Sequence, residues 1–259
     1  MADVLNIALI QSELSWENPE QNRRDFTKKI EGLPDNVDLV VLPEMFTSGF
    51  TMNPARVAET MMGDTILWLK TLASKKQVAI TGSLVITEDG NFYNRMVFVH
   101  PNGTIEHYDK RHTFTLAGED KVYTAGSKKL IVKFKGWNIC PLICYDLRFP
   151  VWSRNAEHYD LLIYVANWPS SRITAWDTLL KARAIENMTY CVGVNRVGTD
   201  ANNNDYSGHS VAYDVLGNRL DQIPENEVAI EVVALHKKDI ATYRSKLSFL
   251  SDQDQFSIT

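Results

Sequence analysis

The chain contains three cysteines, and Cys144 occupies the position best suited to a nucleophile. It directly follows the apolar run Trp137–Ile143, which is typical of a buried strand, and it precedes a more polar segment. A tight turn at a strand end can expose a nucleophile while neighbouring backbone N–H groups point toward it. A buried core cysteine is the alternative interpretation. It fits Cys140 and Cys191 better, because both lie inside apolar runs.

Glu44 and Lys110 are the charged residues that could serve such a thiol. Glu44 follows the strand-like segment Asp38–Pro43, so its carboxylate stands at a strand end and could act as a general base. Lys110 lies in the segment 107–112, where its ammonium could lower the pKa of a nearby thiol and stabilise an oxyanion. A solvated loop carboxylate or helix cap and a solvated basic patch are the competing interpretations.

Other chemistries find weaker support in the sequence. A Cys–His pair needs a histidine, and composition alone offers His112 and His209. A zinc site is rejected because the Cys140–Cys144 spacing has no matching pair of ligands. The segment 202–205 resembles a turn rather than a calcium loop, since it lacks the required glycine and terminal glutamate. We therefore expect neither a metal nor an organic cofactor.

Short β-branched runs alternate with helical patterns early in the chain and follow one another more closely later. The predicted strands are Leu5–Ile10, Leu39–Leu42, Val78–Val85, Arg95–His100, Leu130–Phe134, Trp137–Ile143, Leu161–Val165, Tyr190–Asn195, Ser210–Tyr213 and Glu227–Val233. The predicted helices are Pro19–Glu31, Asp64–Lys75, Val151–His158 and Thr174–Asn187. So many strands exceed one flat sheet, which predicts an α/β fold with two mixed sheets packed between helices. A dinucleotide-binding fold is excluded, because no G-x-G-x-x-G follows the first strand.

The composition suits a single globular domain spanning residues 1–259. Hydrophobic residues make up 44% and charged residues 23%, and the formal net charge of -5 argues against nucleic acid or anionic membrane as a partner. The odd number of cysteines and the absence of a signal-like N-terminus predict a cytoplasmic protein. No apolar stretch approaches the length of a membrane span.

The segments around the three candidate residues together resemble the nitrilase superfamily of carbon–nitrogen hydrolases. The resemblance covers almost the whole chain and rests on the blocks Leu42–Phe46, Tyr108–His112 and Cys144–Pro150, in that order. It implies a four-layer α-β-β-α sandwich, commonly paired as a homodimer through an outer helix layer. It also implies a catalytic set of Glu44, Lys110, Cys144 and a second carboxylate. That carboxylate maps to Glu119 rather than its neighbour Asp120, because of its spacing to Gly126.

Finer features resemble the omega-amidase branch, which hydrolyses the terminal amide of 2-oxoglutaramate and 2-oxosuccinamate. These features are the segments His112–Phe114, Phe149–Arg154, Val165–Pro169 and Ala182–Asn187. The resemblance implies attack by Cys144 with Glu44 as base, and an oxyanion received by Lys110 and the backbone N–H of Tyr145.

A substrate of this kind carries a carboxylate, which requires a cation away from the thiol. Arg148 is the first candidate for that cation and Arg172 the second, since a guanidinium can bind a carboxylate through two hydrogen bonds. Trp168 is a candidate wall of the pocket, and a core position is the alternative for it. A structural role in the turn after Cys144 is the alternative for Arg148.

Three other functions remain open from the sequence. The chain could be another hydrolase of the same superfamily, such as an aliphatic amidase, a carbamoylase or a nitrilase. It could also be a non-catalytic binding protein on the same fold, although the intact set of candidate residues argues against that. Acyl transfer to an amine is the third possibility, and nothing in the sequence suggests a second acceptor pocket.

Overall fold

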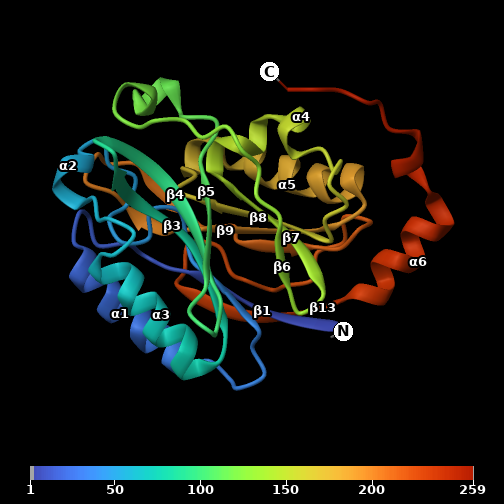
Figure 1. Cartoon of the computed structure of the whole chain (residues 1–259), viewed down its shortest axis with the longest axis horizontal. Helices are drawn as coiled ribbons and strands as arrows, with labels where there is room; N and C mark the ends of the chain where they lie inside the picture. The colour runs from blue at the N-terminus through green and yellow to red at the C-terminus, as the bar shows by residue number, and fades with distance from the viewer. Residues whose placement is uncertain (1–2, 259) are drawn as a thin grey trace.

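The computed structural model describes residues 3–258, which form two β-sheets packed face to face (Figure 1). The first sheet has six strands in the order β13-β1-β2-β3-β4-β5. Strands β1, β2 and β3 are parallel, and the others join antiparallel. Their bounds are β1 Val4–Gln11, β2 Leu39–Val41, β3 Ala79–Glu88, β4 Asn91–Val99, β5 Ile105–Asp109 and β13 Ala229–His236.

The second sheet has five strands in the order β12-β9-β8-β7-β6, with β7, β8 and β9 parallel. Their bounds are β6 Val132–Phe134, β7 Trp137–Ile143, β8 Leu161–Ala166, β9 Tyr190–Asn195 and β12 Val211–Tyr213. A separate two-stranded ribbon is formed by β10 Val197–Thr199 and β11 Asp205–Ser207.

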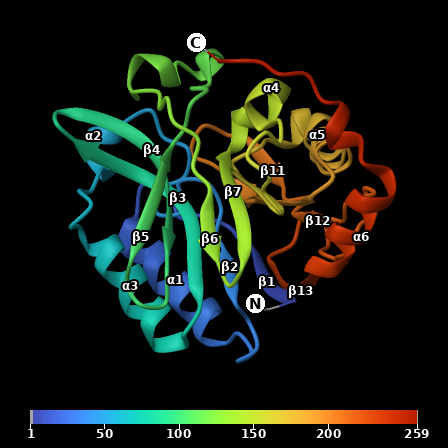
Figure 2. The same cartoon turned by 45° about the vertical axis from the view of Figure 1, so that its right-hand side comes forward.

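Helices cover the outer face of each sheet. Helices α1 (Pro19–Glu31) and α3 (Asp64–Lys76) lie outside the first sheet, and α4 (Pro150–Ser153) and α5 (Ile173–Asn187) lie outside the second (Figures 1 and 2). The remaining helices are α2 (Pro54–Val57), α6 (Lys237–Leu247) and five short 3₁₀ turns. The four-layer α-β-β-α sandwich predicted from the sequence is therefore confirmed. No helix within residues 3–258 is long and apolar enough to span a membrane.

Successive side chains on the strands of the first sheet point alternately to its inner and outer faces. On β4, Met96 and Phe98 belong to the core between the sheets, whereas Val97 and Val99 pack with the outer helices. The same alternation continues one step back along β4. It places Asn94 on the inner face and Arg95 on the outer face.

The topology brings several strand ends to one edge of the sandwich. Glu44 follows β2, and Lys110 follows β5, which runs in the same direction as β2 because two antiparallel steps separate it from β3. In the second sheet, Cys144 follows β7 and Asn167 follows the parallel strand β8. The carboxyl ends of strands in both sheets thus deliver the candidate residues to a common region.

The sequence did not predict strands β5, β10 and β11 or helices α2 and α6. Two of these, β5 and α6, show why, because they are weakly patterned. Strand β5 is a short edge strand in which only Tyr108 is buried, and helix α6 buries only Ile240. The predicted helix Val151–His158 is wrong beyond Ser153. There Arg154 turns to an extended conformation with ψ 134°, and Asn155 instead bonds to Tyr159 and Asn187. These side-chain bonds compete with the helix and end it.

Candidate active site

Glu44 is fixed at the end of β2 by a sharp turn in the chain. Met45, the next residue, has a left-handed backbone with φ 43°, and its N–H donates to the Ser83 hydroxyl at 2.8 Å. A non-glycine residue in this conformation is held there by its surroundings. The turn leaves the Glu44 side chain fully buried and directed into the space between the sheets.

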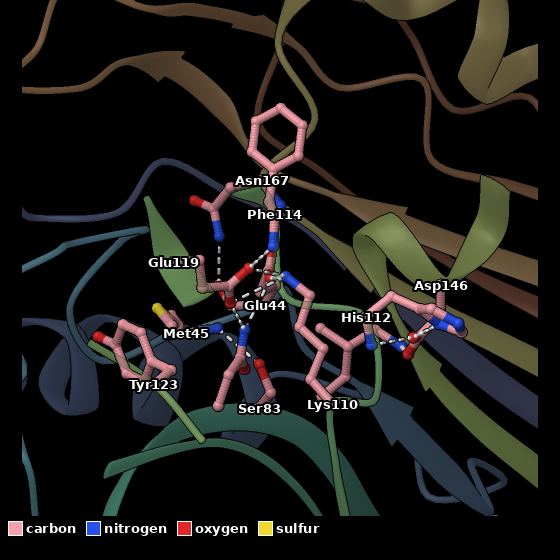
Figure 3. A network of polar contacts seen from close by, with 12 residues as sticks. Glu44, Met45, Ser83, Lys110, His112, Phe114, Glu119, Tyr123, Asp146 and Asn167 are labelled. Atoms are coloured by element: carbon pink, nitrogen blue, oxygen red, sulfur yellow. Dashed lines mark hydrogen bonds and ion pairs between the residues drawn. The ribbon is translucent and has the colours of Figure 1, made fainter. Parts of the chain in front are cut away.

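Three donors surround the Glu44 carboxylate (Figure 3). The Lys110 ammonium and the Asn94 amide donate to Oε1 at 2.9 and 2.8 Å, and the Asn167 backbone N–H donates to Oε2 at 2.8 Å. The Asn167 side chain also donates to the Glu44 carbonyl at 2.6 Å. The sequence did not single out Asn94 or Asn167 as individual residues, although Asn167 lies inside one of the matched segments.

Glu119 is the second carboxylate of this cluster. Its two oxygens accept from the Lys110 ammonium at 3.0 and 2.9 Å, and Oε2 also accepts from the Phe114 N–H at 2.5 Å. Asp120 is exposed, so the structure brings Glu119 and not Asp120 to Lys110. This agrees with the choice made from the spacing to Gly126.

Burial sets the charge states in the cluster. Burial lowers the pKa of the Lys110 ammonium, but Glu119 and Glu44 outweigh it and hold that pKa well above its ordinary value. Burial raises the pKa of Glu119, and Lys110 opposes the rise only in part. Lys110 therefore stays charged, which suits an electrostatic role rather than proton transfer.

Cys144 begins the 3₁₀ turn Cys144–Arg148 in a left-handed conformation with φ 44°. The Asp146 carboxylate holds this turn, because it accepts from the Ile143 N–H at 3.0 Å and the Tyr108 hydroxyl at 2.7 Å. The first N–H groups of such a turn lack partners within the turn. Tyr145 is the second residue of this turn, so the turn itself gives its N–H no hydrogen-bond partner.

The surroundings of Cys144 favour the neutral thiol over the thiolate. Burial raises its pKa well above the ordinary value, and the Glu44 carboxylate raises it further, while Lys110 lowers it. The contribution of Lys110 has the direction expected from the sequence, but burial and the Glu44 carboxylate outweigh it. Attack by such a thiol requires a base that removes its proton.

Neither candidate histidine is that base. The His112 ring is bonded through Nδ1 to Asp146 at 2.7 Å and stacks on Phe149 with a centroid distance of 3.7 Å. His209 pairs with Asp177 at 3.1 Å and with Glu225 at 3.5 Å. His112 therefore supports the turn after Cys144, and His209 is engaged elsewhere.

Cys144 opens onto a cavity of about 210 Å³ that also receives the three residues expected to bind substrate. Arg148 lies over the Trp168 ring at 5.0 Å, and Arg172 lies over the Phe114 ring at 5.3 Å. Within residues 3–258 neither guanidinium forms an ion pair with a carboxylate. Trp168 is 3% exposed and packs on Trp176, so it serves both as cavity wall and as core.

The other two cysteines, Cys140 and Cys191, are fully buried in the core, as predicted. Burial raises the pKa of both thiols. In the part of the chain that the structure describes, no three His, Cys, Asp or Glu side chains are arranged to hold a metal ion.

The α-β-β-α sandwich, the lysine between two buried carboxylates and Cys144 on the cavity fit the nitrilase superfamily that the sequence resembles. The profile of the carbon–nitrogen hydrolase family matches residues 6–245. The chain belongs to this family, and it is a hydrolase that acts on the carbon–nitrogen bonds of amides.

Several relatives match over nearly their whole length. The chain is 43% identical to omega-amidase YafV of Yersinia enterocolitica, covering 97% of this chain and 98% of the relative. It is 41% identical to omega-amidase YafV of Escherichia coli K12, with 98% of each chain covered. A 2-oxoglutaramate amidase of Bacillus subtilis is 33% identical, with 83% of this chain and 84% of the relative covered.

Solved structures agree with this family. XC1258 of Xanthomonas campestris, a CN-hydrolase superfamily protein with an arsenic adduct in its active site, superposes with a TM-score of 0.97. The identity is 39%, and all of both chains is covered. Nit3 of Saccharomyces cerevisiae, at 21% identity and a TM-score of 0.88 over 99% of this chain and 98% of that one, shares the fold.

Proposed function

We propose that this chain is an omega-amidase that releases ammonia from the terminal amide of a small 2-oxo acid, such as 2-oxoglutaramate or 2-oxosuccinamate. The observation that carries the proposal is that the Cys144 thiol and two guanidinium groups, which form no ion pair with a carboxylate of residues 3–258, line one cavity. A thiol can open an amide, and a free guanidinium can bind a carboxylate. The omega-amidases and the 2-oxoglutaramate amidase among the relatives support the same substrate class.

In the first half of the reaction Cys144 attacks the amide carbonyl. Glu44 takes the thiol proton as the carbon–sulfur bond forms, and the negative charge moves to the carbonyl oxygen. The Lys110 ammonium and the Tyr145 N–H stabilise that oxyanion, and one such donor contributes about 3–4 kcal/mol. Glu44 then gives its proton to the amide nitrogen, the carbon–nitrogen bond breaks, and ammonia leaves. A thioester remains on Cys144.

In the second half water replaces ammonia. Glu44 takes a proton from the water as its oxygen attacks the thioester carbonyl, and the same oxyanion donors act again. The carbon–sulfur bond then breaks, Glu44 returns the proton to the Cys144 sulfur, and the acid is released. Glu119 stays bonded to Lys110 throughout and orients its ammonium.

Arg148 and Arg172 bind the substrate carboxylate at the other end of the cavity, and Trp168 forms the wall between. Each guanidinium lies on an aromatic ring, which limits its motion without neutralising its charge. Arg148 belongs to the turn that carries Cys144, so the thiol and this cation are held at a fixed separation. That separation would select the length of the substrate.

The remaining features of the proposal concern the protein as a whole. We place residues 1–259 in a single domain that works in the cytoplasm, because all three cysteines are unpaired. We also propose a homodimer through the outer helices. Val151 on α4 and Ile185 on α5 are 54% and 46% exposed, which suits burial against a second copy. Sedimentation analysis tests the dimer, and a monomer at micromolar concentration would contradict it.

A screen for ammonia release tests the activity. The substrates are 2-oxoglutaramate, 2-oxosuccinamate, glutamine, propionamide, propionitrile and an N-carbamoyl amino acid, each at several concentrations. We expect the highest kcat/KM for the two oxo-acid amides. A higher value for propionamide, the nitrile or the carbamoyl compound would replace the omega-amidase proposal by the corresponding activity of the same superfamily.

A further inference from the structure

Asn94 is a polar side chain in an apolar position. It lies on the inner face of β4, ahead of Met96 and Phe98, and is 1% exposed. A buried amide on such a face costs free energy unless it is hydrogen-bonded, so a role beyond packing is expected.

The contacts of Asn94 join both carboxylates of the cluster. Its Nδ2 donates to Glu44 Oε1 at 2.8 Å and to Glu119 Oε1 at 3.2 Å. The Lys110 Nζ donates to the same two oxygens at 2.9 and 3.0 Å. Two donors and two acceptors therefore close a ring, in which the amide lies between the carboxylates as the ammonium does.

The orientation of the Asn94 amide is fixed by this ring. A flipped amide would direct its carbonyl oxygen at two carboxylates. In the orientation present, Asn94 Oδ1 is buried and has no hydrogen-bond partner among residues 3–258. In this orientation both N–H groups of the amide point at Glu44 and Glu119, and within the described residues the carbonyl oxygen has no hydrogen-bond partner. A buried acceptor without a partner lowers the free energy of unfolding.

The charge of the cluster explains why an amide stands there. The two carboxylates of Glu44 and Glu119 share the single ammonium of Lys110. The titratable groups that also act on this cluster are Cys144, Tyr123 and Tyr206, and Glu17 acts on Tyr123. A second cation in place of Asn94 would give each carboxylate its own ion-pair partner, whereas an amide adds two hydrogen-bond donors and no charge. A neutral donor stabilises both carboxylates and keeps the negative charge that accepts the thiol proton.

We propose that Asn94 is a positioning residue that holds Glu44 and Glu119 together as ionised carboxylates around Lys110, and so keeps Glu44 able to act as the base. This inference rests on the role of Glu44 in the proposed function. If the proposal is correct, removal of the Asn94 side-chain N–H groups should make the carboxylates of the cluster easier to protonate.

The first test is substrate-free. Thermal unfolding of the wild type, Asn94→Leu and Asn94→Asp is followed by circular dichroism between about pH 5 and pH 9. Asn91→Leu is the matched control, since Asn91 is an exposed asparagine on the same strand. We expect the Tm deficit of Asn94→Leu to be at least about twofold larger at the alkaline end, because protonation removes the charges that lack a donor. Asn94→Asp adds a third carboxylate to the cluster. Its Tm deficit should therefore vary more with pH than that of Asn94→Leu.

The second test follows the pH dependence of kcat/KM on the amide that the wild type hydrolyses best. We expect the acidic limb of Asn94→Leu to lie about one pH unit higher than that of the wild type, with that of Asn91→Leu unchanged. A loss of activity at every pH with the limb in place, or Tm deficits that do not depend on pH, would show a packing role and overturn the proposal.

The two proposals fail separately. If the wild type releases ammonia from no oxo-acid amide, the omega-amidase proposal fails, while the unfolding series still decides the role of Asn94. An Asn94→Asp protein that is unfolded at every pH would also overturn the inference, because a protonated aspartic acid closely matches asparagine in shape and can donate to one carboxylate.

Discussion

Two charged clusters lie on opposite faces of the first sheet, next to strands β4 and β5. On the outer face Arg95 bonds bidentately to Asp109 at 2.6 and 2.9 Å and to Glu88 at 2.8 Å. On the inner face, one residue away on each strand, Lys110 bonds to Glu44 and Glu119 with Asn94 alongside. Each cluster has one cation and two carboxylates.

The two clusters respond to their surroundings in opposite directions. On the outer face the hydrogen bond and charge of Arg95 lower the pKa of Glu88, which is 48% exposed at its side chain. On the inner face burial raises the pKa of Glu119, which is not exposed at all. Solvent exposure therefore decides whether a cluster of one cation and two carboxylates acts as a structural ion pair or has the shifted pKa values of a catalytic site.

Removal of the Cys144 thiol, which lies beside the inner cluster, should cause the largest loss of activity of all the variants. Cys144→Ala should lower amide hydrolysis by a factor on the order of 10⁴ or more, because Cys144 is the only thiol that lines the cavity among residues 3–258. The measurement is steady-state ammonia release, with circular dichroism to verify the fold. Cys140→Ala is the matched control, and turnover retained by Cys144→Ala would remove the thiol from the mechanism.

Removal of each cation compares the two faces directly. Lys110→Met should reduce kcat roughly 10²–10³-fold and cost about 3–5 kcal/mol of unfolding free energy near neutral pH, since two buried carboxylates lose their partner. The loss of stability should shrink as the pH falls, because protonation of the carboxylates removes the unpaired charges.

Arg95→Met is the counterpart on the outer face. Its carboxylate partners can reach water, so we expect a cost of about 1–2 kcal/mol and less than a tenfold change in kcat. Denaturant unfolding and initial rates measure both variants. Equal losses of activity from Lys110→Met and Arg95→Met would mean that the inner cluster has no special role.

The unpaired arginines should act on binding rather than chemistry. Arg148→Ala and Arg172→Ala should each raise KM for an oxo-acid amide about 10–100-fold and leave hydrolysis of a neutral amide such as propionamide nearly unchanged. Arg24→Ala, an exposed arginine far from the cavity, is the control. An equal loss on neutral and carboxylate-bearing amides would indicate that these side chains only support the turn.

The smallest effect belongs to the half-exposed carboxylate of the outer cluster. Glu88 has a lowered pKa, so its contribution is present above its ordinary pKa of 4.5 and is lost as the pH falls through the lowered value. Glu88→Gln should cost only a few tenths of a kcal/mol near neutral pH and progressively less at acidic pH as Glu88 becomes protonated, with kcat unchanged. Unfolding in urea at neutral and at acidic pH measures the difference. A larger loss of stability at acidic pH than at neutral pH would contradict a lowered pKa of Glu88.

Local patterns in the sequence were enough for most of the fold. Runs such as Leu39–Leu42 and Trp137–Ile143 are apolar and β-branched because both faces of their strands are buried, and they matched β2 and β7 closely. Strand β5 and helix α6 carry few apolar residues, so nothing local distinguished them from loops. Contacts with other elements hold them in place, such as Arg95 on the neighbouring strand β4 for Asp109 and Asp160 for Lys237.

The candidate site divides in a similar way. Glu44, Lys110 and Cys144 stand beside short recognisable segments, whereas Asn94 looks like an ordinary strand residue. One signal was available for Asn94. It is a polar residue in register with Met96 and Phe98 on the inner face of an alternating strand.

The sequence by itself determined which chemical groups this protein brings to its site and in what order along the chain. Strand periodicity and the position of a residue at a strand end are local properties, so they can be read without the fold. The tertiary structure decided which carboxylate meets Lys110, that Asn94 and Asn167 complete the bonds to Glu44, and that the net pKa of the Cys144 thiol is raised. These depend on burial and on distances between segments as far apart as Glu44 and Asn167, and they exist only once the two sheets have packed.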